Sequence, residues 1–293
     1  MAIPLFSVVI PTRHRNDLLA QCLDCLKPGI QTLSADQYEV IVTDDGSNST
    51  AEELIQHHYP WVKWVPGAGK GPAANRNNGA RYARGKWLVF TDDDCIPDPQ
   101  WLSAYVEAIR IYPGYKVLEG RVYVDRPRQS LAEKSPINET GGYLWSCNLA
   151  INIKLFESLE GFDERFPYAA MEDVALRTRL LSLGHQPLFC ERASVCHPWR
   201  LQSNLTLFTK KKKSVLLYLD IFPEEYQRLN STYYLKAFTR SLTHHLPDGI
   251  FNLGCKGILQ ELIKAIFFIY MSCILLGCRF SNVRPLEKSA NSG

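Results

Sequence analysis

The sequence predicts an α/β protein with a mostly parallel sheet, helices on both faces of that sheet, and a helical region at the C-terminus. Two observations carry this prediction. Apolar runs of strand length alternate with stretches of helical periodicity through about the first 115 residues, which is typical of parallel strands joined by crossover helices. Beyond about Pro198 the alternation stops and the spacing of apolar residues becomes helical. We therefore expect an α/β domain over residues 1–200 and a helical region over residues 201–293.

The first half of the α/β domain reads as strands and helices in turn. Strands are expected at Phe6–Ile10, Tyr38–Thr43 and Trp87–Thr91. Asn16 is expected to cap the first helix, which ends at Pro28. Ser49 and Glu52 form a capping-box pattern at the start of a second helix, and further helices are expected at about 73–83 and at 99–112.

The second half of the domain is less regular. A strand is expected at Lys116–Val124, followed by a polar loop and a short helix before Gly161. A longer helix is expected to begin near Glu172 and to end at Gly184. Glycine at that place accepts the left-handed conformation in which many helices end.

Charge and cysteine content narrow the classes of function. The net charge is only +3, so no overall positive field favours a nucleic-acid partner. The nine cysteines are an odd number, and the N-terminus lacks the basic start and long apolar run of a secretory leader. We therefore expect free thiols and a cytoplasmic protein.

Three consecutive carboxylates, Asp92 to Asp94, follow the strand at Trp87–Thr91. Alone, such a triplet is more often a solvated acidic turn. Two other strand ends carry Pro11–Thr12 and Asp44–Asp45, and parallel strands present their carboxyl ends at one edge of a sheet, where ligands bind. We therefore interpret the triplet as part of a site, with a hard divalent cation, Mg²⁺ or Mn²⁺, as its counter-charge.

Other polar residues are candidates for the same site, each with a structural alternative. Asp44 can bind a nucleobase or ribose, or it can cap a turn. Arg76 can hold a base or phosphate, or it can be a surface cation. Glu172 and Asp173 can supply a general base, or they can be acids that favour the start of a helix. His197 can bind a metal or phosphate, or it can be a core histidine.

These motifs, taken in order, resemble those of family 2 glycosyltransferases over about residues 5–200. The matching segments are Ser7–Thr12 (SVVIPT), Val42–Ser47 (VTDDGS), Arg76–Gly79 (RNNG), Phe90–Pro97 (FTDDDCIP), Gly161–Glu164 (GFDE) and Glu172–Asp173 (ED). The resemblance implies the GT-A fold, a Rossmann-like, mostly parallel sheet flanked by helices. It implies a nucleotide-sugar half at about 1–115 and an acceptor half at about 116–200.

The resemblance also implies an inverting, hexosyl-type transfer from a nucleotide-diphosphate sugar, expected to be a UDP-sugar, with Mn²⁺ or Mg²⁺ as cofactor. Asp173 would be the catalytic base, with Glu172 beside it. Asp94, Asp92 and His197 would hold the metal. The residues expected to bind the nucleotide sugar are Pro11, Thr12, Arg13, Asp44, Arg76, Asp92 and Asp93.

Trp145 and Asn148 are expected on the acceptor side. The chain departs from the family there, because Ser146–Cys147 replaces a common glycine before Asn148 and Ala175 replaces a frequent acid two places after the base. Those departures affect the acceptor side and leave the donor motifs intact. The expected acceptor is a glycan or lipid-linked saccharide in polysaccharide or cell-envelope biosynthesis.

The C-terminal region contains a charge-free apolar run, Ala265–Cys278, which is too short to span a bilayer comfortably as a helix. With Lys210–Lys213 and Lys256 nearby, it predicts either a helix lying on the cytosolic face of the inner membrane or a helix that packs on the protein. Two rival functions remain. One is an inactive sugar-nucleotide-binding or scaffold protein. The other is a sugar nucleotidyltransferase, which the absence of a glycine between Pro11 and Arg15 disfavours.

Overall fold

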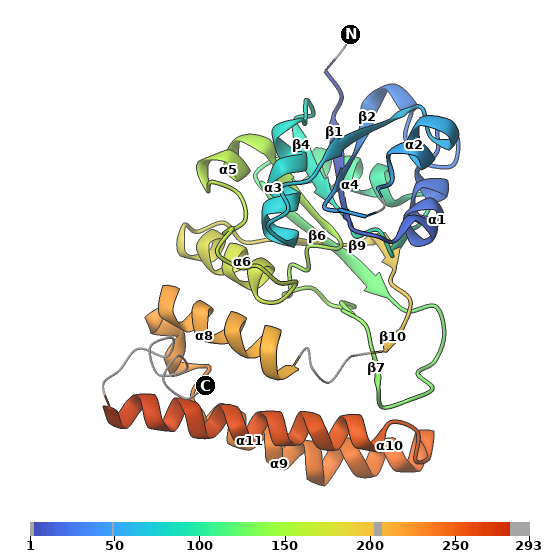
Figure 1. Cartoon of the computed structure of the whole chain (residues 1–293). Helices are drawn as coiled ribbons and strands as arrows, with labels where there is room; N and C mark the ends of the chain where they lie inside the picture. The colour runs from blue at the N-terminus through green and yellow to red at the C-terminus, as the bar shows by residue number, and fades with distance from the viewer. Residues whose placement is uncertain (1–2, 49, 202–206, 282–293) are drawn as a thin grey trace. The chain divides into compact units, whose positions relative to one another are not determined.

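The computed structural model describes residues 3–48, 50–201 and 207–281 (Figure 1). Contacts within the chain divide it into two compact units. The first comprises residues 1–125 and 136–198, and the second comprises residues 126–135 and 199–293. The segment 126–135, which lies inside our expected domain of residues 1–200, thus packs with the second unit. Ser49 of the expected capping box lies outside the described ranges, as do residues 202–206 and 282–293 of the expected helical region.

The first unit is built on one mixed, mostly parallel sheet. Its strands are β1 (Phe6–Thr12), β2 (Tyr38–Asp44), β3 (Val62–Pro66), β4 (Trp87–Phe90), β5 (Ile96–Pro97), β6 (Val117–Tyr123), β8 (Leu149–Asn152) and β9 (Leu188–Cys196). Their order across the sheet is β3-β2-β1-β4-β8-β6-β9-β5. The pairs among β3, β2, β1 and β4 are parallel, as is β6 with β9. Strand β8 runs antiparallel to both β4 and β6.

Helices cover both faces of this sheet (Figure 1). They are α1 (Asn16–Leu26), α2 (Glu52–His58), α3 (Pro72–Arg81), α4 (Trp101–Ile111), α5 (Ile153–Ser158) and α6 (Glu172–Ser182), with a 3₁₀ turn at Ala35–Gln37. Strand β1 shows why both faces need cover, because alternate strand residues point to opposite faces. Val8 belongs to one buried apolar cluster and Val9 to the other, and both are fully buried. The expected fold class is therefore confirmed.

Three details differ from the expectations. Asn16 is the first residue of α1 and does not cap it; its side-chain amide donates to the Thr50 carbonyl. Strand β3 was not predicted, because only Val62 and Val65 in it are buried, as befits an edge strand. Strand β8 was also missed. By contrast, α6 begins at Glu172, and Gly184 follows it with a φ of +80°.

The second unit is mainly helical. A two-stranded antiparallel sheet pairs β7 (Glu133–Lys134) with β10 (Arg200–Leu201). The helices are α8 (Lys212–Ile221), α9 (Ser231–Arg240), α10 (Leu246–Leu253) and α11 (Ile258–Ser281), with π turns at Leu207–Lys211 and Ser241–His245 and a 3₁₀ turn at Pro223–Gln227. Helix α11 packs along α9, where the Ser272 hydroxyl donates to the Ser231 carbonyl at 2.9 Å.

Helix α11 is the one helix among the described residues that is long and apolar enough to cross a membrane. Its apolar window, Ile258–Cys278, is 39% buried within the protein. A core helix passes the same test of length and composition, so the test alone does not place α11 in a membrane.

Candidate active site

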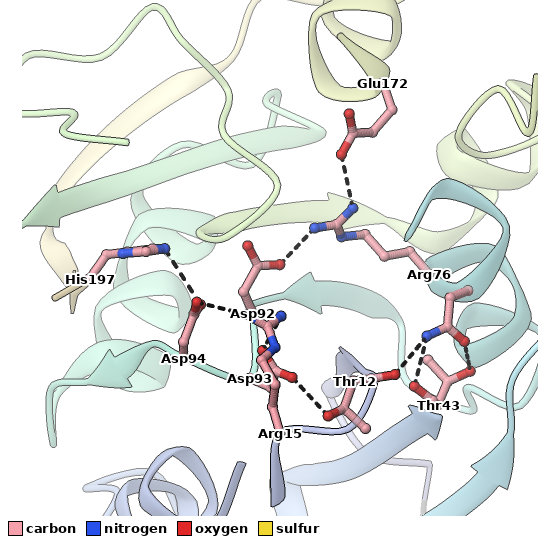
Figure 2. Close-up of polar contacts among 10 residues, drawn as sticks. Thr12, Arg15, Thr43, Arg76, Asp92, Asp93, Asp94, Glu172 and His197 are labelled. Atoms are coloured by element: carbon pink, nitrogen blue, oxygen red, sulfur yellow. Dashed lines mark hydrogen bonds and ion pairs between the residues drawn. The ribbon is translucent and has the colours of Figure 1, made fainter. Parts of the chain in front are cut away.

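The three acids of the triplet lie where strand β4 ends, and each has its own set of partners, with Arg15 shared by two of them (Figure 2). Asp92 contacts Arg76, Asp93 contacts Thr12 and Arg15, and Asp94 contacts Arg15 and His197. These partners come from the end of β1, from α3 and from the end of β9. The carboxyl ends of neighbouring strands thus meet at one edge of the sheet, as the sequence pattern predicts.

Asp93 is the structural member of the triplet. Its side chain is fully buried, the Thr12 hydroxyl donates to Oδ2 at 2.7 Å, and the Arg15 guanidinium lies 2.6 Å from Oδ1. Burial raises the pKa of Asp93 to about 7, although the Arg15 charge and the Thr12 hydrogen bond act against that rise. Arg15 also contacts Asp94 Oδ2 at 3.0 Å, so one cation joins two adjacent acids.

Asp94 and His197 form the candidate metal centre. His197 Nε2 lies 3.5 Å from Asp94 Oδ1, and both side chains are buried. Ligands about 2.1 Å from one Mg²⁺ or Mn²⁺ ion stand roughly 3 Å apart, so this pair fits a shared cation. Cys95 Sγ completes a group whose ligand atoms lie within 4.8 Å of one another, but Cys95 belongs to the buried apolar cluster and a hard cation prefers oxygen and nitrogen over sulfur.

Arg76 connects the triplet to the second acidic pair. Its side chain is 3% exposed, and its two terminal nitrogens lie 2.6 Å from Asp92 Oδ1 and 3.2 Å from Glu172 Oε1. The guanidinium also lies over the Phe162 ring, 5.7 Å from its centroid. The surface-cation alternative for Arg76 is therefore wrong. Asp92, expected as a metal ligand, directs one oxygen to this arginine, away from His197 (Figure 2).

Glu172 and Asp173 begin α6 but differ in environment. Glu172 is 3% exposed and bound to Arg76, whereas Asp173 is half-buried and its Oδ1 accepts the Val174 N–H at 2.8 Å. Burial raises the pKa of both carboxyls, and the Asp173 charge raises that of Glu172 further. Met171, just before them, has a φ of +71°, an uncommon conformation for a non-glycine residue that is often found at functional sites. Asp173 is thus the more accessible of the two acids.

Asp44 is buried in the turn that follows β2. Its two oxygens accept the N–H groups of Gly46 at 2.8 Å and Ala51 at 2.6 Å. The capping alternative therefore accounts for both oxygens, and contact with a base stays a prediction that uses their remaining lone pairs. Pro11 is a buried residue of β1, and Arg13 is exposed just beyond that strand.

Two asparagines of α3 position the site, and neither role was predicted from the sequence. Asn75 donates to the Thr43 carbonyl at 2.9 Å and accepts from the Thr43 hydroxyl at 2.6 Å. Asn77 donates to the Phe162 carbonyl and accepts the Phe162 N–H, both at 2.8 Å. Between Asn77 and the GFDE turn there is room only for glycine, since a Cβ on Gly161 would meet Asn77 Oδ1 at 2.4 Å.

Of the two acceptor-side residues, Asn148 is corrected by the structure. It is 1% exposed; its oxygen accepts from Trp101 and Tyr105, and its nitrogen donates to the carbonyls of Arg121 and Ala193. The amide ties the core together and is enclosed by the protein, so it does not reach an acceptor.

Trp145 lies in a different environment. It stacks on exposed Tyr143 at a centroid distance of 5.3 Å and an interplanar angle of 17°. Buried Glu119 holds the backbone of this loop by accepting the N–H groups of Gly142, Tyr143 and Leu144. The loop therefore presents a fixed aromatic surface, and its role in acceptor binding stays a prediction.

Comparison with known proteins identifies the family. Residues 7–147 match the family model described as glycosyl transferase family 2. The chain is 30% identical over 168 residues to the chondroitin synthase of Escherichia coli, covering 55% of this chain and 24% of that protein. It is 29% identical over 223 residues to the validoxylamine A glucosyltransferase of Streptomyces hygroscopicus subsp. limoneus, covering 62% and 49%. The chain therefore spans about half or less of these relatives.

Among solved structures, GalNAc-T7 with UDP, GalNAc and Mn²⁺ aligns with a TM-score of 0.59 and 18% identity, covering 89% of this chain and 56% of that one. This likeness confirms the fold. Together with the matched motifs, the sheet order and the acids gathered at its edge, these comparisons identify residues 7–147 as a glycosyltransferase family 2 segment and show that the chain has the GT-A fold.

Proposed function

We propose that this protein is a metal-dependent, inverting glycosyltransferase that transfers a sugar from a nucleotide-diphosphate sugar, a UDP-sugar, to a saccharide acceptor. One observation carries the proposal. Arg76 joins Asp92 of the triplet to Glu172, the neighbour of Asp173. The acids proposed to bind the sugar donor and the carboxylate proposed as general base are thereby held at one site. A direct displacement needs both at the same place.

On the donor side, the proposal assigns the nucleotide to the edge formed by the ends of β1, β2 and β4. Thr12, Asp44 and Asp93 stand at those ends. The candidate metal ligands Asp94 and His197 lie next along the same edge. A cation held there would neutralise the diphosphate and stabilise it as a leaving group. The Mn²⁺ and UDP in the GalNAc-T7 structure support this reading.

On the acceptor side, Asp173 is the proposed general base. Its carboxylate accepts the proton of an acceptor hydroxyl while that oxygen forms a bond to the anomeric carbon. The bond from that carbon to the diphosphate oxygen breaks in the same step, and its electron pair leaves with the nucleoside diphosphate. Attack on the face opposite the leaving group inverts the anomeric configuration. Burial of Asp173, which raises its pKa, makes the carboxylate a stronger base.

Glu172 has a separate part in this scheme. Its ion pair with Arg76 fixes the first turn of α6, so we assign it to positioning Asp173 and not to proton transfer. Trp145, stacked on Tyr143, is the proposed acceptor contact.

The acceptor class we propose is a glycan or a lipid-linked saccharide, met at the cytosolic face of a membrane. The nine cysteines, all within the described residues, are free thiols, which supports a reducing compartment.

The test measures release of UDP from a panel of UDP-sugars with Mn²⁺, with and without saccharide acceptors, for the natural chain and for Asp173→Asn and Glu172→Gln. We expect Asp173→Asn to lower kcat by about 10²–10⁴-fold while the thermal shift produced by UDP with Mn²⁺ is unchanged. Glu172→Gln leaves the proposed base, Asp173, in place and should lower kcat less.

Three outcomes would contradict the proposal or the role it gives to Asp173. Binding of UDP-sugar and Mn²⁺ without turnover by the natural chain, over the whole panel, would favour an inactive sugar-nucleotide-binding protein. Release of pyrophosphate on mixing UTP with a sugar phosphate would favour a nucleotidyltransferase. Equal loss of UDP binding and turnover in Asp173→Asn would make that residue structural.

A further inference from the structure

Over residues 259–276, helix α11 of the second unit has a face whose exposed residues are apolar. The exposed positions recur every three or four residues and therefore lie on one side of the helix. They are Leu259, Leu262, Ile266, Tyr270, Cys273 and Leu276. Leu259 is 63% exposed and Ile266 is 55% exposed. At about 1.5 Å per residue, this face runs for roughly 25 Å.

Glu261, Lys264 and Ser272 of α11 lie on the opposite side and make contacts inside the second unit. Glu261 is 2% exposed; its carboxylate accepts from the Ser241 hydroxyl at 2.7 Å and pairs with Lys264 at 3.1 Å. Ser272 is also buried, and it bonds to the first residue of α9. A surface helix of a globular protein ordinarily shows the reverse distribution, and exposed apolar patches of this extent mark interaction sites.

A run of lysines lies beside this apolar face. Phe208, in the π turn before α8, packs against Phe267 and Tyr270 of α11 with ring centroids 5.5 and 5.8 Å apart. This contact holds the start of the Lys210–Lys213 run next to α11. Lys212 Nζ lies 3.4 Å from the Tyr270 hydroxyl and 5.6 Å from its ring centroid. The apolar face therefore has a cationic border at Tyr270, an aromatic residue of the kind favoured at membrane interfaces.

We propose that this face, together with the Lys210–Lys213 run, binds an anionic lipid surface, with α11 lying in the interface. The apolar residues of α11 would contact the boundary of the acyl chains, and the lysines would contact the lipid phosphate groups. The proposal deepens the membrane contact in the proposed function by naming its surface and its lipid charge.

The packing of α11 favours lying over spanning. One side of the helix is occupied by α9, by the Ser241–Glu261–Lys264 network and by the Phe208 contact. Lipid can reach the exposed side only. A spanning helix would have to break the Glu261 network or carry that network into the hydrocarbon, at high cost.

The experiment measures co-sedimentation of the full chain with vesicles of phosphatidylcholine, and with vesicles containing about 30% phosphatidylglycerol, chosen because anionic lipid attracts basic segments. The variants are Leu259→Asp with Ile266→Asp on the apolar face, and Lys211→Glu with Lys213→Glu on the basic border. The matched control is Leu183→Asp in the first unit, because Leu183 is 62% exposed and lies outside α11. Circular dichroism and the UDP–Mn²⁺ thermal shift report that each variant is folded.

We expect the natural chain and the control to bind the anionic vesicles and to bind phosphatidylcholine at least about tenfold more weakly, with binding reduced by salt. Each paired variant should lose at least about tenfold in binding to anionic vesicles. Release by alkaline carbonate would support a helix that lies on the surface, whereas release by detergent alone would overturn it in favour of spanning.

Other outcomes also overturn the proposal. They are equal binding of all variants, absence of vesicle binding by the natural chain, or a dimer in light scattering that the Leu259 and Ile266 changes dissociate without any vesicle binding. Vesicle binding with no response to any UDP-sugar would refute the glycosyltransferase proposal while leaving this one standing. Turnover without vesicle binding would do the opposite.

Discussion

Replacing Arg76 with methionine is the change whose consequences the structure defines most fully. Methionine keeps an unbranched apolar stem beside Phe162 but removes the charge between Asp92 and Glu172. Glu172 would then be a buried carboxylate without its cation, while Asp92, with a side chain 21% exposed, would regain some solvation. Removing one partner of a buried ion pair costs about 3–5 kcal/mol. We expect a cost near the lower end of this range, because Asp92 is partly exposed to solvent and Glu172 can bind a proton and become neutral.

A cost of about 3 kcal/mol corresponds to a fall in Tm of roughly 6–12 °C for a domain of this size. The penalty should depend on pH, and its sign follows from Glu172. Burial raises the folded-state pKa of Glu172 above its unfolded value, and Arg76 opposes that rise. Without Arg76 the folded pKa rises further, so the ionised carboxyl destabilises the variant most at high pH. In the natural chain the folded pKa of Glu172 is already about 8, so the extra penalty of the variant should grow as the pH rises through that value and shrink as the pH falls below it.

The assay is thermal unfolding by circular dichroism between about pH 5 and pH 10, which brackets this titration. The natural chain, Arg76→Met, Glu172→Gln and the double variant form a mutant cycle. Adding Glu172→Gln should return about half or more of the lost stability, because the neutral amide is cheaper to bury unpaired than a carboxylate. An Arg76→Met protein with an unchanged Tm would refute the reasoning. So would a penalty that is the same at all pH values or is unaffected by Glu172→Gln.

Three further predictions concern the metal, the base and the turn beside them. Asp94→Asn should raise the Mn²⁺ concentration for half-maximal turnover by about tenfold or more, and unchanged Mn²⁺ dependence would remove Asp94 from the metal centre. The acid limb of the kcat–pH profile should lie above the value of about 4 usual for aspartate, because burial raises the pKa of Asp173 and activity is lost as this base is protonated; a limb at or below 4 would contradict its role. Gly161→Ala should destabilise the protein by about 1–3 kcal/mol, since residue 161 has a φ of +71° and a Cβ would press on Asn77; an unchanged Tm in urea or heat would mean that the turn relaxes freely.

The sequence predicted the sheet edge because that information is local. A buried apolar strand followed at once by acids is visible in a few residues, and the parallel topology brings such strand ends together. Strand β8 was missed because antiparallel insertion into an α/β sheet leaves no local mark. Its register with β4, from Trp87 opposite Asn152 to Phe90 opposite Leu149, is set by contacts between residues far apart in the sequence.

Two residues show where local patterns mislead about a site. Arg15 was not assigned, since nothing near it indicates that Asp93 and Asp94, 78 and 79 residues away, are its partners. Asn148 was assigned to the acceptor because it lies in a polar family segment, yet its amide is used up by Trp101, Tyr105 and two strand carbonyls. A polar residue inside a motif can serve the core, and only burial and hydrogen-bond saturation reveal it.

The distribution of charge explains how one small region can hold so many acids. Each arginine bridges two carboxylates: Arg15 joins Asp93 to Asp94, and Arg76 joins Asp92 to Glu172. Arg15 takes Oδ2 of Asp94, while Oδ1 faces His197. One arginine thus orients the proposed metal ligand, and the other fixes the helix turn that carries Asp173. Because Arg76 also contacts Asp92, its replacement should affect both donor binding and proton transfer, whereas replacement of Arg15 should affect donor binding alone.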